Sequence, residues 1–497
     1  MLLLGIDLGT SAVKVSVLDA DSRICLASAS FPEQEAGIIS LQPGWAEQSP
    51  DSWWDHVQKA ILKLLASDLF PSAEIAAIGI AYQMHGLVLV DKDQKVLRNA
   101  IIWCDSRAVP FGGEAFDKIG AEICFSHLLN SPGNFTAAKL AWVKTHEPEL
   151  YAKIDQILLP GDYIAMKLTG ACTTTVSALS EGIFWDFREN RLSRDVMDFY
   201  GFPDSVIPEL RDVFSIHGLL KKELADRLGL PAGIPVSYKA GDQLNNALSL
   251  NIFEPGEVAA TAGTSGVLYG ITDQLFYDRE SRINSFAHVN YTASRKRIGV
   301  LLCINGTGIL NRWLKNLLGN QLDYETLNKR AEKIPRGSEG LLVFPFGNGA
   351  ERMLQNKIPG AQIQKIDLNR HTPEHLYRAG QEGIAMAFRF GFDIMRENGM
   401  LPRVIRAGSA NMFLSSIFTE TLVNLIKVPV ELFDTEGSVG AAVGAGIGAK
   451  LYASPAEAFS RIKPARLLEP SDTLSFEERY GVWKSLLLKS LQTDSPL

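Results

Sequence analysis

Two copies of a Gly-Thr-Ser turn are the residues of this chain best suited to chemistry. Gly9-Thr10-Ser11 follows an apolar run near the N-terminus, and Gly263-Thr264-Ser265 follows a second apolar run in the other half of the chain. A tight turn between strands directs successive backbone N–H groups and hydroxyls to one point, which makes an anion site without formal positive charge. One copy alone would be an ordinary hairpin. Two copies predict a pair of loops that grip a polyphosphate from both sides.

Two aspartates lie at the ends of apolar runs, where a turn or a helix begins. Asp7 comes directly before the first turn, where a buried carboxylate needs a cation or several N–H donors. Next to a phosphate that cation would be Mg²⁺, bound directly or through water, and bonding to its own turn backbone is the alternative. Asp242 lies between an apolar strand and a helix start, as an N-cap or as the acceptor of a proton from an attacking hydroxyl. Asp7 and Asp242 are the minimum carboxylate set for phosphoryl transfer.

A polar segment follows another apolar strand at Gln83-Met84-His85. A sugar needs neutral donors and acceptors together with an apolar face, and an amide, an imidazole and a thioether supply them. A histidine that only completes the core is the alternative for His85. Asp105 and Arg107, at the end of a further strand, are as well suited to pair with each other as to contact a substrate.

The elements that must position these groups are short strands followed by tight turns and helices. Alternating and continuous apolar runs predict strands, and apolar residues at helical spacing predict helices. The expected strands are 2–8, 13–18, 24–29, 75–80, 234–240, 257–261, 267–271 and 404–408; the expected helices are 52–65, 138–145, 162–168, 242–250, 309–318, 373–397, 413–426 and a helix from Gly437. Small residues line this last helix, so another element is expected to pack very close to it.

The repeated strand-turn-strand unit predicts two similar domains. We place the domains at 1–252 and 253–497, with a shared interface because no Pro/Ser-rich linker separates them. The alternation of strands and helices makes the fold class α/β. Ligands of such folds bind where strands end and helices begin, so the cleft between the domains is the expected site.

Composition excludes several classes of protein. The chain has 497 residues, 46% hydrophobic and 21% charged, which is typical of a globular protein and excludes a disordered or collagen-like chain. A net charge of −7 gives no basic excess for nucleic acid or an anionic membrane. The five cysteines are scattered and form no zinc or disulfide pattern: Cys25, Cys104, Cys124, Cys172 and Cys303. We therefore expect free thiols and a cytoplasmic protein.

The ordered set of motifs resembles the FGGY family of carbohydrate kinases over nearly the whole chain. The motifs occupy residues 5–11, 83–86, 101–107, 139–142, 159–163, 241–242 and 262–266. The resemblance implies two ribonuclease-H-like (actin-like ATPase) domains with a cleft between them. It also implies ATP and Mg²⁺, and transfer of the γ-phosphoryl group to a sugar hydroxyl.

The resemblance assigns roles residue by residue. Asp242 matches the catalytic base, and Asp7 matches the aspartate near the metal. Met84 and His85 match the sugar-contacting pair of ketopentose-phosphorylating members, with Gln83 and Gln243 beside them, whereas glycerol-phosphorylating members carry an Arg-Glu pair there. The positions matched to ATP binding are Thr10, Ser11, Lys14, Gly263, Thr264, Gly306, Trp313, Gly408 and Asn411.

The expected activity is therefore ATP-dependent phosphorylation of D-xylulose at its 5-hydroxyl. The expected partners are the sugar and ATP, without nucleic acid or membrane, and a homodimer is allowed. L-Ribulose, gluconate or L-fuculose is the alternative acceptor. An actin-like or chaperone-like ATP switch is the alternative of another class, although Met84, His85 and Asp242 favour a small polar substrate.

Overall fold

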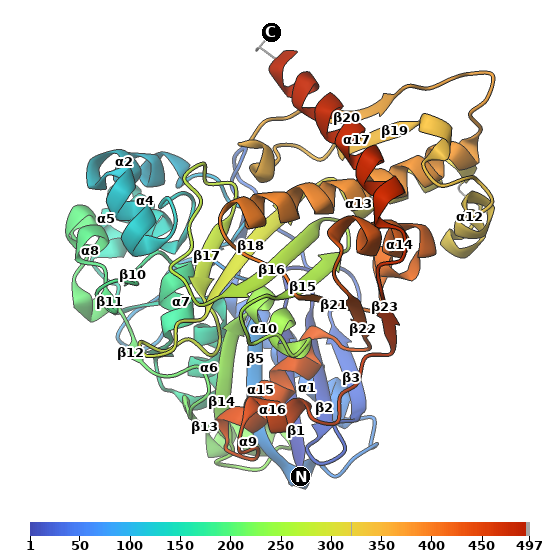
Figure 1. Cartoon of the computed structure of the whole chain (residues 1–497). Helices are drawn as coiled ribbons and strands as arrows, with labels where there is room; N and C mark the ends of the chain where they lie inside the picture. Colours follow the sequence, from blue (N-terminus) through green and yellow to red (C-terminus); the bar gives the residue numbers. More distant parts are fainter. Residues whose placement is uncertain (320, 494–497) are drawn as a thin grey trace.

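Two large mixed sheets organise the chain in a computed structural model, which describes residues 1–319 and 321–493 (Figure 1). The first sheet has the strand order β13-β14-β5-β1-β2-β3 and the second β17-β18-β16-β15-β21-β22-β23. The first contains β1 (Leu2–Leu8), β2 (Val13–Asp19), β3 (Cys25–Phe31), β5 (Ile75–Tyr82), β13 (Gly218–Leu219) and β14 (Pro235–Gly241). The second contains β15 (Glu257–Ala262), β16 (Gly266–Thr272), β17 (Asn284–Ala287), β18 (Ile298–Ile304), β21 (Val404–Gly408), β22 (Val430–Phe433) and β23 (Arg466–Leu468).

The centres of the two sheets have the same topology. In the first, β1 pairs antiparallel with β2 and parallel with β5, which pairs parallel with β14. In the second, β15 pairs antiparallel with β16 and parallel with β21, which pairs parallel with β22. The order β3-β2-β1-β5-β14 is thus repeated as β18-β16-β15-β21-β22. The predicted pair of ribonuclease-H-like units is confirmed.

The helices cover these sheets (Figure 1). The longer helices before residue 253 are α1 (Pro50–Leu65), α2 (Val109–Ile119), α4 (Thr136–His146), α6 (Pro160–Thr169), α7 (Val176–Glu181), α8 (Arg194–Tyr200), α9 (Lys222–Leu228) and α10 (Asp242–Ser249). Those that follow are α11 (Gly308–Gly319), α12 (Tyr324–Ala331), α13 (Pro373–Glu397), α14 (Ser416–Ile426), α15 (Gly437–Gly448), α16 (Pro455–Phe459) and α17 (Thr473–Thr493).

Shorter elements complete the chain. They include α3 (Ala121–Ile123), α5 (Pro148–Tyr151), the π-helical turn η2 (Cys124–Leu128), and the 3₁₀ turns η5 (Arg352–Leu354) and η6 (Asn411–Leu414). The small strands are β4 (Glu47–Gln48), β6 (Val88–Val90), β7 (Ala100–Ile101), β8 (Gln156–Leu158), β9 (Thr173–Thr174), β10 (Trp185–Asp186), β11 (Arg191–Leu192), β12 (Glu209–Leu210), β19 (Leu342–Phe346) and β20 (Gly360–Gln364). None of the helices in the described part of the chain is long and apolar enough to cross a membrane.

Helix α15 packs against the first sheet, although it comes from the second half of the chain. A Cβ on Gly5 of β1 would lie 1.8 Å from the Ser438 carbonyl oxygen, and one on Gly79 of β5 would lie 2.0 Å from that of Ala441. Only residues without a side chain allow helix and sheet to approach this closely. The predicted close packing is confirmed, while the division at residues 252 and 253 stays a prediction.

The predicted helix over 413–426 is wrong at its start. Asn411–Leu414 forms the 3₁₀ turn η6, and α14 begins only at Ser416. The hydroxyl of Ser415 accepts a hydrogen bond from the backbone N–H of Phe418, at 3.4 Å. This cap satisfies a free N–H at the start of the helix and separates the two elements.

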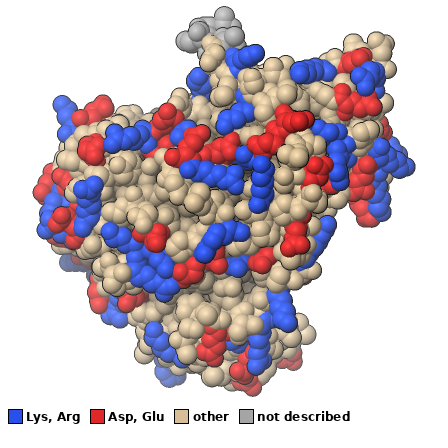
Figure 2. Space-filling view, viewed as in Figure 1, with Lys and Arg blue, Asp and Glu red and all other residues tan. Residues whose placement is uncertain are grey.

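Charges of both signs alternate on the face seen in Figure 2, where Lys and Arg lie beside Asp and Glu. The large surface is therefore electrostatically mixed on this side.

Candidate active site

Side chains from both halves of the chain line one pocket of about 440 Å³, which we call the central pocket. Of the predicted substrate-binding residues it contains Met84, His85, Asp242 and Gln243. Residues that follow 253 complete its wall, among them Ser265, Asn284, Cys303 and Arg352. The volume is in the range of small-molecule sites.

Asp242 lies at the junction of β14 and α10. Gly241 occupies the N-cap position and Asp242 is the first residue of the helix, so the N-cap interpretation of Asp242 is wrong. A Cβ on Gly241 would lie 2.6 Å from Met84 Cγ, so the turn passes too close to Met84 for a larger residue. The carboxylate is thereby free of a capping role. Burial, reinforced by the charge of Asp7 and opposed by hydrogen bonds from Gln243, raises the pKa of Asp242 to about 7.

Asp7 is the penultimate residue of β1 and faces Lys14 across the β1–β2 pair. Burial raises the pKa of Asp7 to about 6; Lys14 opposes this shift, and Glu436 adds to it. A Cβ on Gly437 would lie 2.1 Å from Asp7 Oδ2, so the start of α15 touches this carboxylate. The ammonium of Lys14 is paired with Glu436, with 2.5 Å between Nζ and Oε2. No ion pair joins Asp7 to a cation among the described residues.

His85 enters the central pocket as a neutral acceptor. Its Nδ1 lies 3.1 Å from the Glu181 carbonyl oxygen, and a carbonyl can only accept, so the ring proton is on Nδ1. Burial and the charge of Lys139 lower the pKa of His85 to about 3. The backbone of His85 has φ = 60°, and the Lys139 ammonium donates to its carbonyl oxygen at 2.8 Å. The remaining ring nitrogen, Nε2, is left with a lone pair for a hydroxyl.

Gln83 does not line the central pocket; it supports the first Gly-Thr-Ser turn. The Thr10 hydroxyl donates to Gln83 Oε1 at 3.2 Å and accepts from the Trp103 indole at 3.0 Å. The next residue, Ser11, is exposed and accepts from the backbone N–H of Ala36 through its carbonyl oxygen. The first turn is thus held by side chains beside the central pocket.

A second pocket of about 320 Å³ surrounds the other turn, and we call it the turn pocket. It contains Gly263, Thr264 and Asn411 of the predicted ATP-binding residues. The first N–H groups of α11 bond to the turn, from Gly308 to the Gly263 carbonyl at 2.9 Å and from Ile309 to that of Thr264 at 3.0 Å. Ser265 of the same turn lines the central pocket, so the two pockets adjoin at this turn.

Six of the nine predicted ATP-binding residues line neither pocket: Thr10, Ser11 and Lys14, described above, and Gly306, Trp313 and Gly408. Gly306 is buried against β19, where a Cβ would lie 1.9 Å from the Pro345 carbonyl oxygen. Trp313 is 52% exposed and lines a separate apolar pocket of about 310 Å³ against β19 and β20. Gly408 ends β21, three residues before Asn411. Their assignment to ATP binding stays a prediction.

Asp105 and Arg107 pair with each other, as one of the two sequence interpretations holds. The Arg107 guanidinium lies 2.7 Å from Asp105 Oδ2, with both side chains buried, and also pairs with Glu47 at 2.7 Å. This pair is part of the core below Trp103.

Two functional candidates were missed from the sequence. Arg352 lines the central pocket from a loop that carries no motif, and its bonding partners lie about seventy residues earlier. Glu181 is fully buried, with Oε2 2.7 Å from the Cβ position of Gly241. Neither of its carboxyl oxygens has a partner at normal hydrogen-bond distance among the described residues. Burial, followed by the charge of Asp242, raises the pKa of Glu181 well above its usual range.

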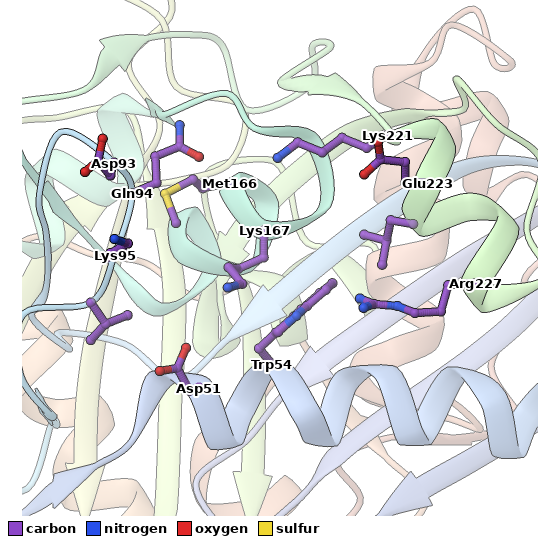
Figure 3. A pocket seen from close by; sticks show the side chains of 12 residues that line it. Asp51, Trp54, Asp93, Gln94, Lys95, Met166, Lys167, Lys221, Glu223 and Arg227 are labelled. Carbon is purple, nitrogen blue, oxygen red and sulfur yellow. The ribbon is translucent and has the colours of Figure 1, made fainter.

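A surface pocket of about 570 Å³ lies apart from all predicted site residues (Figure 3). Cationic and acidic side chains both line it; Lys95, Lys167, Lys221 and Arg227 face Asp51, Asp93 and Glu223. Its mixed charge selects no ligand class.

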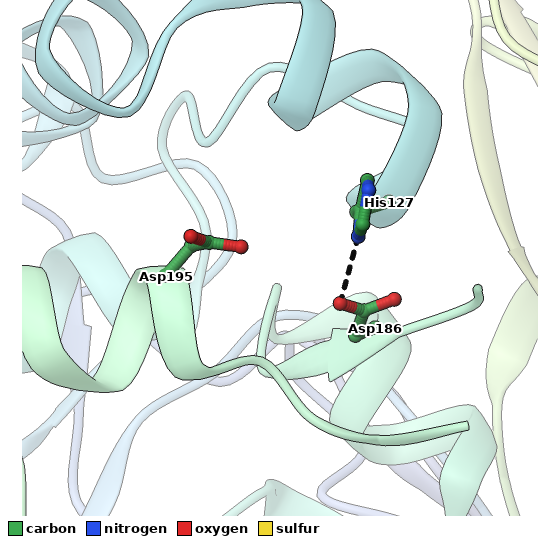
Figure 4. Close-up of side chains that lie close together, drawn as sticks. All are labelled: His127, Asp186 and Asp195. Carbon is green, nitrogen blue, oxygen red and sulfur yellow. Dashed lines mark hydrogen bonds and ion pairs between the residues drawn. The ribbon is translucent and has the colours of Figure 1, made fainter. Parts of the chain in front are cut away.

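A group of possible metal ligands is formed by His127, Asp186 and Asp195, whose ligand atoms lie within 4.8 Å (Figure 4). His127 Nδ1 is 2.9 Å from Asp186 Oδ2. The other oxygen of Asp186 accepts the backbone N–H groups of Arg188 and Glu189, at 2.8 and 2.9 Å. This carboxylate therefore has a structural role, anchoring the turn after β10.

Comparison with known proteins identifies the family. The model of the N-terminal domain of the FGGY family of carbohydrate kinases matches residues 2–249. A xylulose kinase of Bacillus subtilis is 30% identical over 80% of this chain and 78% of its own, and one of Escherichia coli is 28% identical over 97% and 96%.

A solved structure extends the likeness to three dimensions. The crystal structure of a "xyloylose kinase" from Brucella ovis has a TM-score of 0.88 and 26% identity, and covers 99% of this chain and all of the other. The duplicated sheets, the pocket between them and these relatives agree: the chain belongs to the FGGY family of carbohydrate kinases.

Proposed function

We propose that this kinase transfers the γ-phosphoryl group of ATP to the 5-hydroxyl of D-xylulose, giving D-xylulose 5-phosphate and ADP for pentose catabolism. The observation that carries the proposal is the central pocket, where Asp242 shares one volume of about 440 Å³ with Met84 and His85. The names of the relatives described above support the same acceptor.

Asp242 is proposed as the catalytic base. A general base works best when its pKa is near the operating pH, and the pKa of Asp242 is about 7. In the direct transfer, the 5-hydroxyl oxygen forms a bond to the γ-phosphorus, the bond to the β,γ-bridging oxygen breaks, and Asp242 takes the hydroxyl proton. His85 Nε2 accepts from a second sugar hydroxyl, while Met84 offers an apolar surface and Gln243 lies beside the base.

The two turns are proposed to hold ATP. Thr10 and Ser11 meet the phosphates from one sheet, and Gly263 and Thr264 meet them from the other, with Asn411 on the nucleoside side of the turn pocket. Lys14 would join them only if it leaves Glu436. Gly306, Trp313 and Gly408 are proposed as outer contacts of the nucleotide.

Mg²⁺ is proposed to bind at Asp7. The residues fit a hard divalent cation, because a carboxylate with a raised pKa lies close enough to Asp242 to raise the pKa of that group too. The one lysine facing Asp7 is already paired with Glu436. When bound, Mg²⁺ supplies neutralisation of charge on the phosphate oxygens.

We also propose that the enzyme works in the cytoplasm, because its five cysteines are all free thiols. A homodimer stays a prediction.

The test of the function is ADP release measured over a panel of sugars. We expect D-xylulose to give the highest kcat/KM, above L-ribulose, gluconate and L-fuculose. A different best sugar would contradict the acceptor but not the kinase. ATP hydrolysis that no sugar stimulates would instead favour an ATP switch of the actin or chaperone kind.

A further inference from the structure

Arg352 is a cation of the central pocket without a carboxylate partner. Its Nε donates to the Ser281 carbonyl oxygen at 3.0 Å, and Nη1 donates to Asn284 Oδ1. Nη2 has no hydrogen-bond partner in the described part of the chain, and no ion pair to Arg352 is found there. Arginines of this chain that are half-buried like Arg352, such as Arg282 and Arg406, pair with carboxylates.

A half-buried guanidinium without a carboxylate partner has lost part of its hydration, so it favours an anion from outside the chain. Burial lowers the pKa of Arg352, opposed by Cys303. The neighbouring Glu351 does not neutralise it, because its carboxylate accepts the backbone N–H groups of Asn305 and Gly306 at 3.0 and 2.9 Å. The Arg352 guanidinium is therefore available to bind an anion from outside the chain.

Asp242, the proposed base, lines the same pocket as Arg352. Asp242 comes from the β14–α10 junction and Arg352 from η5, and the two side chains form no ion pair. His85 and Cys303 line this pocket too and are uncharged at neutral pH, since burial lowers the pKa of His85 to about 3 and raises that of the Cys303 thiol. The base and the cation thus line one pocket without neutralising each other.

We propose that Arg352 is a catalytic residue that binds the phosphoryl group during its transfer. The inference rests on the proposed phosphotransferase reaction at this pocket. As the sugar oxygen bonds to the γ-phosphorus and the bridging oxygen leaves with ADP, Nη2 donates to an equatorial phosphoryl oxygen, while the hydroxyl proton passes to Asp242. Ser265 belongs to the second turn, which is proposed to hold the phosphates, and it lines the same pocket as this guanidinium.

A carboxylate on the sugar is the other source of an oxyanion for this site. The phosphoryl group is favoured because every sugar kinase reaction delivers it next to the base, whereas an acidic sugar would require a second cationic contact. Met84, His85 and Gln243, the residues facing the expected sugar, are neutral.

The experiment compares Arg352→Gln and Arg352→Lys with wild type. We measure kcat and KM for each substrate, and the affinity for ADP with aluminium fluoride, which mimics the transferring phosphoryl group. Arg352→Gln is expected to lower kcat by about a hundredfold or more, to weaken the aluminium fluoride complex by a similar factor, and to leave the affinities for ATP and sugar within about threefold. Arg352→Lys keeps the charge and should lose less.

Arg370→Gln is the matched control, because Arg370 is exposed and pairs with Glu339 at 3.0 Å outside every pocket described above. Its rates should equal those of wild type. Melting temperatures show whether the loss of the bonds to Ser281 and Asn284 unfolds the Arg352 variants. If it does, kcat and the aluminium fluoride affinity are measured below the melting temperature of each variant, where it is folded, and a wild-type kcat there would overturn the proposal.

A raised sugar KM with unchanged kcat, or an aluminium fluoride complex as tight as that of wild type, would overturn it. So would a preference for an acidic sugar that Arg352→Gln abolishes. The aluminium fluoride measurement does not depend on which sugar is the natural acceptor. A failure of D-xylulose in the sugar panel therefore leaves this test decisive.

Discussion

Burial gives Asp242 a pKa of about 7, so its charge changes near neutral pH. Only the ionised form can accept the hydroxyl proton. Two neighbours set this value, since Asp7 raises it and Gln243 lowers it. The sequence allowed Asp242 to be an N-cap or a base, and the structure leaves only the second role open because Gly241 takes the cap position.

We predict that Asp242→Asn lowers kcat by roughly a hundredfold or more while ATP and sugar still bind. In wild type, kcat/KM should fall as the pH drops below about 7, because the carboxylate becomes protonated. The residual rate of the variant should lose this acid limb. Calorimetry for binding and a pH–rate profile check both statements, and a near-normal rate for Asp242→Asn would refute the base assignment.

Glu181 should affect how the free energy of unfolding depends on pH. Its pKa in the folded chain is raised above the ordinary value of 4.5, so the folded state keeps a proton that the unfolded state releases. Stability gained by this proton is complete below the unfolded pKa and is lost as the pH rises toward the folded pKa, by about 1.4 kcal/mol per pH unit. Glu181→Gln cannot ionise and is therefore expected to gain stability over wild type as the pH rises above the ordinary value of 4.5.

Urea unfolding at several pH values measures this difference. Exposed Glu223→Gln is the control and should run parallel to wild type at every pH. A constant difference between Glu181→Gln and wild type would mean that Glu181 is already ionised in the folded chain.

At the scale of elements, the local pattern of apolar residues predicted the strands and helices correctly wherever that pattern alone determines the structure. The strands β1, β2 and β5 and the long helix α13 lie where the apolar runs and spacing predict them. The small residues from Gly437 correctly predicted a helix in close contact. The sequence did not show that its partner is the first sheet, because Gly5 and Gly79 are hundreds of residues away.

The candidate site also contains residues that the sequence predicted and residues that it did not. The turns and the residues at or just after strand ends, such as Asp7, His85 and Asp242, could be named from the sequence. Each of them is marked by the apolar run that comes before it. Arg352 could not, since its position depends on Ser281 and Asn284, which hold the guanidinium from a distant strand and loop. Gly306 matched a motif, yet the structure explains it by the close approach of β19.

At the scale of the molecule, each half of the chain completes the other. Helix α15 from the second half covers the first sheet, and β17 at the edge of the second sheet is held by residues of the first half. The Ser180 hydroxyl accepts the backbone N–H of Ala287 at 2.9 Å. Asn284 of β17 lines the central pocket, so the shape of this pocket depends on contacts that cross the halves.

Asn130 is the clearest of these contacts and gives a prediction for the whole molecule. This buried amide donates to the Ser285 carbonyl at 2.7 Å and accepts from Asn284 Nδ2 and the Ser285 N–H, both at 3.0 Å. Asn130→Ala leaves buried groups unpaired and should cost about 3 kcal/mol of stability. It should also lower kcat, because Asn284 holds Arg352.

Urea unfolding and steady-state kinetics of Asn130→Ala test this, with exposed Asn369→Ala as the control that should change neither. Lower stability together with lower kcat would show that the bond across the halves sets the geometry of the pocket. Lower stability with an unchanged kcat would mean that Asn284 keeps Arg352 in place without Asn130, so that the cross-half contact serves folding alone. Unchanged stability would contradict the claim that these bonds hold β17 against the first half of the chain.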